Sequence, residues 1–200
     1  MGKLFIAISV GFLVVSGVHP HDRFTWLLEV SWVMVGLGVL GYIGYKGIPL
    51  STPLKSALFI HSLILIYGGW YTYELTPLGD AVSAVFGYDR NHYDRAGHFA
   101  QGLFPAILYR EALVRAKVVA EKWWRELFVF ALAMAFSALF EIIEFLSALA
   151  FGAASNAYLG SQGDIWDAQW DMIYCGLGAL VCIVFFSKWH CRMIEKLNAP

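Results

Sequence analysis

The sequence predicts an all-α membrane protein, a polytopic transmembrane helical bundle with about six spanning helices. Three observations support this prediction. The 200 residues are 59% hydrophobic and 14% charged, with a mean hydropathy of +0.61, whereas a soluble domain is about half apolar and about a quarter charged. A spanning helix needs about 20 apolar residues, and six apolar runs have this length or nearly so. Lysine and arginine gather in alternate connecting segments, as they do on the cytoplasmic side of a membrane.

The apolar runs are, in order, Leu4–Val18, Phe24–Tyr45, Leu54–Tyr73, His98–Val114, Leu127–Phe151 and Gln169–Trp189. The first is the shortest and also fits a secretory signal peptide, but residues 15–17 form a poor cleavage pattern, so we expect a retained helix. Glu74–Tyr93 is too polar to span, and Asp80–Phe86 within it is expected to lie as a short interfacial helix on the outer face. Pro105 is expected to kink its helix. Without repeats or linkers, residues 1–200 are expected to form a single domain.

The orientation follows from the basic residues. With the N-terminus in the cytoplasm, eleven of the 14 lysines and arginines lie on the cytoplasmic side. Only Arg23, Arg90 and Arg95 lie outside. This asymmetry predicts that both termini are cytoplasmic.

Three short polar stretches lie in or against these runs. They are Asp94-x-x-x-His98-x-x-Gln101, Glu141-x-x-Glu144 and Asp164-x-x-Asp167-x-x-x-Asp171. Each spacing places its side chains on one face of a helix, and ionisable groups at membrane depth normally face the bundle interior and mark function. The predicted orientation brings all three stretches near the outer face, with the glutamates about 10–15 Å deep at 1.5 Å per residue. We therefore expect a pocket that opens outward.

Five carboxylates and a histidine in one pocket cannot all be charged and unpaired. One solution is a divalent metal, and this donor set suits zinc, manganese, iron or magnesium. The expected metal ligands are His98, Glu141, Asp167 and Asp171. Glu144 or Asp94 would then act as a general base or orient His98. The other solution is proton sharing among the carboxylates, as in proton relays.

Structural roles are alternatives for the same residues. Asp164 could cap the last helix, Asp94 could pair with Arg90 or Arg95, and the two glutamates could pair across helices with His98 or Arg95. Among the other polar groups, His61 is expected to be a hydrogen-bonded core residue, and His92 either a ligand or a loop residue. His190 and Cys191 are expected to be interfacial. Three cysteines are too few for a disulfide framework and fit no zinc spacing, so Cys175 and Cys182 are expected in the core or facing lipid.

The segments YDRAGHFAQG, FEIIEF and GDIWDAQWDM, in this order at these helix ends, resemble the YjdF-like family of bacterial inner-membrane proteins over nearly the whole chain. The resemblance implies a multi-pass protein of the inner (plasma) membrane. More distantly the segments resemble the VanZ-like family, named for a teicoplanin-resistance protein. Asp94, His98 and Phe99 match its Asp-x-x-x-His-Phe motif, and Glu141 and Asp167 match later acidic positions.

This sequence departs from the VanZ-like pattern at Glu144, where glutamine is usual, at Asp171, where asparagine is usual, and at Tyr174, which replaces a glycine. The extra carboxylates make the pocket more acidic and favour a cation. Neither family implies a reaction.

Three functions compete. The first is a metal-dependent or acid/base enzyme acting on a lipid head group or lipid-linked precursor. The second is a cation- or proton-coupled transporter, although no inverted repeat is visible. The third is a scaffold whose polar or ion-bound core holds three helices in register. A net charge of −1 argues against nucleic acid as a partner, and the lipid bilayer is the expected surrounding of the chain.

Overall fold

The computed structural model describes residues 2–152, 158 and 161–198, and its regular structure is helical throughout. The elements are α1 (Gly2–Val18), α2 (Arg23–Tyr45), α3 (Thr52–Trp70), α4 (Pro77–Phe86), α5 (Tyr93–Leu103), α6 (Pro105–Arg115), α7 (Lys122–Phe151), α9 (Asp167–Val181), η2 (Cys182–Phe186) and α10 (Ser187–Asn198). The predicted all-α bundle is confirmed.

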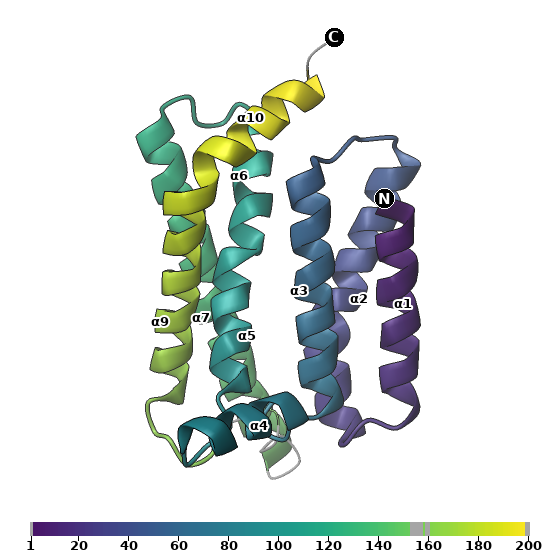
Figure 1. Ribbon diagram of the computed structural model, residues 1–200, viewed down its shortest axis with the longest axis vertical. Coiled ribbons are helices and arrows are strands. Elements are labelled where there is room, and N and C mark those ends of the chain that lie inside the picture. Colours follow the sequence, from purple (N-terminus) through teal and green to yellow (C-terminus); the bar gives the residue numbers. More distant parts are fainter. Residues whose placement is uncertain (1, 153–157, 159–160, 199–200) are drawn as a thin grey trace.

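The long helices run side by side in two groups (Figure 1). One group holds α1, α2 and α3, and the other holds α5 with α6, α7 and α9. Helix α4 crosses one end of the bundle and α10 crosses the opposite end, where both chain termini also lie. We call the α4 end the outer end and the α10 end the inner end, after the orientation that the basic residues predict.

Side chains and prolines at the helix ends explain several boundaries. Asp22 accepts a hydrogen bond from the Thr25 N–H (2.7 Å) at the start of α2, and Ser51 accepts one from the Leu54 N–H (3.2 Å) at the start of α3. Such caps satisfy amide groups that have no partner within the helix. Gly87 ends α4 at a φ of 71°, in the left-handed region that glycine adopts at little cost.

At Pro105, where a kink was predicted, the helix is interrupted. The run His98–Val114 forms two helices, α5 and α6, that meet at Phe104, because proline supplies no N–H to the preceding turn. The last run is also interrupted: the π-helical segment η2 joins α9 to α10. Such insertions locally alter the direction of a helix, and α10 leaves the axis of α9 here (Figure 1).

Helices α5 and α9 touch backbone to backbone. A Cβ atom added at Gly102 would collide with the Cys175 carbonyl, and one at Gly178 would collide with the Phe99 carbonyl. Small residues permit this approach between membrane helices. The seam fixes the separation between the helices that carry Asp94 and Asp171.

A strained turn follows α3. Thr72 and Tyr73 have φ values of 58° and 55°, a conformation that non-glycine residues rarely adopt. The Tyr73 ring fills a slot whose walls are Gly68 and Gly97, and a Cβ atom at either glycine would press on it. The turn thus inserts a buried aromatic side chain between α3 and α5.

The surface is apolar and the interior is partly ionic, the reverse of a soluble domain. Val14, Leu149 and Phe185 are more than 60% exposed, whereas Glu111, His190 and other ionisable side chains are buried. Among the described residues, three helical stretches are long and apolar enough to cross a membrane: Arg23–Tyr45, Lys122–Phe151 and Asp167–Leu197. Each of the six expected runs corresponds to a helix or helix pair, and six crossings stay a prediction.

Candidate functional site

The three polar stretches converge at the outer end of the bundle. Asp94 and His98 lie one turn apart on α5, Glu141 and Glu144 lie on α7, and Asp171 lies in the second turn of α9. His98, Glu144 and Asp171 are each less than 10% exposed. The helical spacings therefore placed these side chains on interior faces as predicted.

Asp94, His98 and Asp171 form the tightest group. One ligand atom from each lies within 4.8 Å of the other two. The His98 Nε2 atom is 3.6 Å from Asp94 Oδ1 and 3.7 Å from Glu141 Oε1. These distances are too long for good hydrogen bonds, so the side chains face one another across a small space.

Several polar atoms of this group lack partners. His98 Nδ1, Glu141 Oε1 and Asp171 Oδ1 are buried and accept or donate no hydrogen bond within the described part of the chain. Buried polar atoms are nearly always satisfied in folded proteins, and exceptions point to a role such as binding an ion or water. Of these atoms, Glu141 Oε1 lies on the side of the shared space, 3.7 Å from His98 Nε2.

An ionic network closes the outer side of this group. Arg90 Nη1 lies 2.9 Å from Asp167 and 3.5 Å from Asp164, while Arg95 Nη2 lies 2.7 Å from Asp164 and 3.8 Å from Asp167. We call these four residues the mouth network. It ties the segment before and within α5 to the start of α9.

The mouth network decides two of the structural alternatives. Arg90 and Arg95 pair with the late aspartates, and the side chain that faces Asp94 is His98, 3.6 Å away. Asp164 also accepts a hydrogen bond from the Trp166 N–H (2.9 Å). Trp166 is itself the cap residue of α9, and no side chain of the described residues caps this helix end, so the predicted capping role of Asp164 was wrong and its ion pairs remain. Of the four expected metal ligands, Asp167 is the one that an arginine engages.

Sequence reasoning missed Glu29. This α2 residue is 6% exposed and packs against Gly69 of α3. The charges of Asp94 and Glu141 act on it, which extends the acidic group to a fourth helix. The signal was present in the sequence, because Glu29 is the one acidic residue within the apolar run 24–45.

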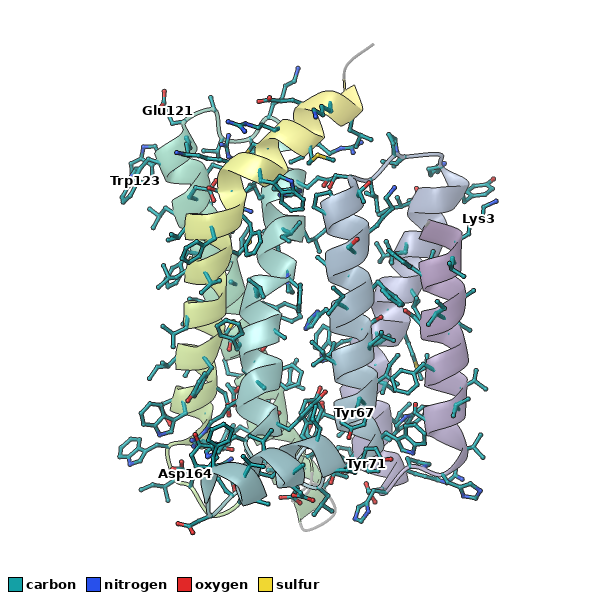
Figure 2. The ribbon with its side chains drawn as sticks, in the orientation of Figure 1. Lys3, Tyr67, Tyr71, Glu121, Trp123 and Asp164 are labelled. Atoms are coloured by element: carbon teal, nitrogen blue, oxygen red, sulfur yellow. The ribbon has the colours of Figure 1, made fainter. Side chains whose placement is uncertain are left out.

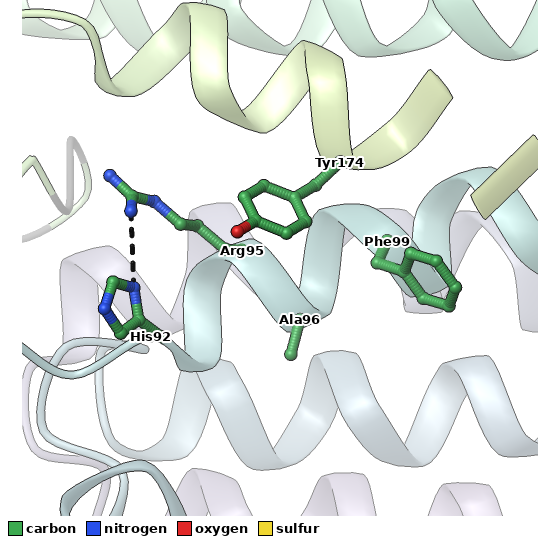
Figure 3. A pocket seen from close by; sticks show the side chains of 5 residues that line it. All are labelled: His92, Arg95, Ala96, Phe99 and Tyr174. Atoms are coloured by element: carbon green, nitrogen blue, oxygen red, sulfur yellow. Dashed lines mark hydrogen bonds between the residues drawn. The ribbon is translucent and has the colours of Figure 1, made fainter. Parts of the chain in front are cut away.

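A pocket of about 270 Å³ lies beside the mouth network, between α5 and α9 (Figure 3). Its lining residues are His92, Arg95, Ala96, Phe99 and Tyr174. The Nδ1 atom of His92 is 3.4 Å from Arg95 Nη1. Burial lowers the pKa of His92, and the positive charges of Arg95 and Arg90 lower it further. The wall of this pocket therefore disfavours the charged form of the His92 imidazole.

The remaining histidines differ from expectation. His61 packs near the Phe104 ring (6.1 Å between centroids), and its buried Nε2 atom has no hydrogen-bond partner among the described residues, so the predicted hydrogen bond at this atom is absent. The prediction for His190 was wrong, because this residue is fully buried and contacts Glu111 Oε2 (3.1 Å) and Ser51 Oγ (3.3 Å). His190 lies near the end of an apolar run, and the sequence around it did not indicate Glu111 and Ser51, which come from distant segments.

The cysteines are free thiols. Cys175 and Cys182 are fully buried, so of the two predicted locations, the core and the lipid-facing surface, the core is confirmed. Cys191 is partly exposed near Arg125. Nearby, the buried Arg110 donates to both oxygens of Glu126 (2.8–3.2 Å). The inner end thus has a polar interior of its own.

Residues 1–192 match the family described as "Predicted membrane protein (DUF2238)". The chain belongs to this family. It is also 41% identical over 186 residues to the inner membrane protein YjdF of Escherichia coli (strain K12), a match that covers 93% of this chain and 88% of the relative. No solved structure matches the chain.

Family membership and the apolar helices establish a multi-pass protein of the bacterial inner membrane. The predicted resemblance to the YjdF-like family is confirmed. The helical bundle is embedded in the lipid bilayer.

Proposed function

We propose that the outer group of Asp94, His98 and Asp171 binds a divalent cation. The observation that carries this proposal is the convergence of one ligand atom from each residue within 4.8 Å, at a place where His98 and Asp171 are buried. Two carboxylates and one imidazole suit zinc, manganese, iron or magnesium.

The separations between ligand atoms support a shared ion. A tetrahedral ion with bonds of about 2.0–2.2 Å holds its ligand atoms roughly 3.3–3.6 Å apart. The distances from His98 Nε2 to Asp94 and Glu141, 3.6 and 3.7 Å, are close to this range. Glu141, whose Oε1 atom has no hydrogen-bond partner among the described residues, is the proposed fourth ligand.

The roles proposed for the other acids follow from their neighbours. Asp94 serves as a ligand because it has no arginine partner, and Asp167 belongs to the mouth network because Arg90 holds it. Glu144, buried one helical turn beyond Glu141, is the proposed general base or the group that orients a ligand. Glu29 adds negative charge that favours a cation.

The activity we propose is metal-assisted hydrolysis of a membrane-associated substrate, such as a lipid head group or a lipid-linked precursor. A divalent cation would polarise water or a substrate oxygen there. The site lies at the outer end, near the level of lipid head groups. The adjacent pocket offers Arg95 and His92 to a polar group, and Ala96 and Phe99 to an apolar chain.

Metal content of the purified protein tests the cation site. We expect one equivalent of metal in the wild-type protein and a loss of at least about tenfold in metal affinity for Glu141→Gln and Asp171→Asn. Asp89→Asn, an exposed acid at the same end, is the matched control and should keep its metal. If the wild-type protein binds none of the four metals and the variants match the control, the cation site is wrong.

Two further assays separate the competing functions. Proteoliposomes made from a bacterial lipid extract should release a head-group product that depends on metal and on Glu144. A flux of protons or cations under a gradient, with no lipid product, would favour a transporter. Loss of thermal stability in Asp171→Asn, with neither product nor flux in the wild-type protein, would favour a scaffold.

A further inference from the structure

A second cavity lies at the inner end, far along the bundle from the acidic group. This groove has a volume of about 370 Å³ and runs between α3, the junction of α5 with α6, and the segment from η2 to α10. Its walls are mainly apolar and include Ala57, Ile60, Leu103, Ile107, Phe186 and Trp189. Thr52 and Ser56 add hydroxyl groups near the start of α3.

Buried polar contacts hold α10 as one wall of the groove. His190 of α10 contacts Glu111 of α6 (3.1 Å), and Ser51 donates a hydrogen bond to the same carboxylate through its hydroxyl and another through its backbone N–H (3.0 Å). We call these three residues the inner latch. Ile194, one turn beyond His190, is 1% exposed and packs in the core. The latch therefore fixes the direction in which the neighbouring residues of α10 point.

The free face of α10 is basic. Lys188, Arg192 and Lys196 follow one another at intervals of four residues and are exposed, so they form one stripe along the helix. Trp189 follows Lys188 and Met193 follows Arg192 in the sequence, and both line the groove. The stripe and the groove thus lie on adjacent faces of one short helix, which crosses the inner end of the bundle (Figure 1).

We infer that the groove holds an acyl chain of an anionic phospholipid, whose head group binds the stripe of Lys188, Arg192 and Lys196. The groove adjoins helices that span the membrane, so a bilayer lipid is the apolar molecule in contact with it. Basic residues on an amphipathic helix at the cytoplasmic face attract anionic head groups. Trp189, which is 49% exposed, lies where the chain and the head group of such a lipid would meet.

Charge selects an anionic lipid over a zwitterionic one. The stripe carries three positive charges, and Glu195 is the acidic residue in α10. Each basic residue near a negative leaflet contributes roughly a fivefold gain in binding. This lipid site shares no residue with the outer acidic group, so it stands whether or not that group binds a metal.

Lipid binding in nanodiscs tests the inference. The probes are phosphatidylglycerol and phosphatidylcholine, mixed at equal amounts, and the readout is the lipid retained after extraction and native mass spectrometry. We expect bound phosphatidylglycerol in the wild-type protein and a loss of roughly 10- to 100-fold in its affinity for the triple variant Lys188→Gln, Arg192→Gln, Lys196→Gln.

Two matched controls keep the test specific. The triple variant Lys46→Gln, Lys117→Gln, Lys122→Gln removes the same charge from exposed positions outside α10 and should retain the lipid. Ile60→Trp fills the groove and should displace the lipid, whereas Ile142→Trp, on the exposed face of α7, should not. Equal retention by the two triple variants would overturn the head-group assignment, and unchanged binding in Ile60→Trp would overturn the groove.

Discussion

At the scale of residues, the outer group depends on one close backbone contact. Gly102 of α5 and Gly178 of α9 let the two helices touch, and Asp94 and Asp171 extend from these helices toward each other. The distance between the two carboxylates is therefore set by the seam as much as by side-chain rotamers. This dependence is testable without any assumption about activity.

Replacing Gly102 with alanine should destabilise the protein by about 1–3 kcal/mol, because the added methyl group overpacks the seam. Thermal unfolding in detergent measures the change. Gly38→Ala is the matched control, since a Cβ atom at Gly38 meets nothing within 4 Å. Equal melting temperatures for the two variants would contradict the backbone contact.

At the scale of elements, polar side chains from distant segments fix α10. The inner latch joins the cap of α3, the body of α6 and the first turns of α10. Because its members are buried, removing one leaves the others without partners, which costs more than an exposed hydrogen bond would. The helix lies at the end of the chain, so its detachment need not unfold the bundle.

Glu111→Gln or His190→Ala should release α10. We expect faster amide hydrogen exchange across residues 187–198, with exchange in the middle of α7 unchanged, because the latch residues belong to α10, α6 and the cap of α3 and not to α7. Glu195→Gln, which alters an exposed residue of the same helix, serves as the control. Slow exchange in α10 of the latch variants would show that apolar packing alone holds it.

At the scale of the whole molecule, the two ends of the bundle differ in charge and in what they bury. Carboxylates gather inside the outer end, while most basic residues and both termini are at the inner end (Figure 2). Residues at opposite ends should therefore be exposed to opposite sides of the membrane.

Labelling of an introduced cysteine in intact cells tests this orientation, because the native Cys175 and Cys182 are buried. With Cys191 replaced by serine, a cysteine at Asp89 should react with a membrane-impermeant maleimide, and one at Lys117 should react only after the cells are opened. Both positions are exposed, so access rather than burial decides the result. The reverse pattern would place the acidic group on the cytoplasmic side.

The sequence predicted the helices better than the contacts between them. Apolar length and period located each helix, and the spacing of Asp94, His98, Glu141 and Asp171 correctly placed them inside. Pairing across helices was harder, because Arg90 and Arg95 choose partners about 70 residues away. The inner latch was missed for the same reason, since His190 meets Glu111 and Ser51 only after the chain has folded.

The stretch from α9 through η2 to α10 carries Asp171 near one end and His190 near the other. The π-helical segment lies between the two, where α10 leaves the axis of α9. The direction of α10 at the inner end thus depends on a backbone segment that is continuous with the helix carrying Asp171 at the outer end.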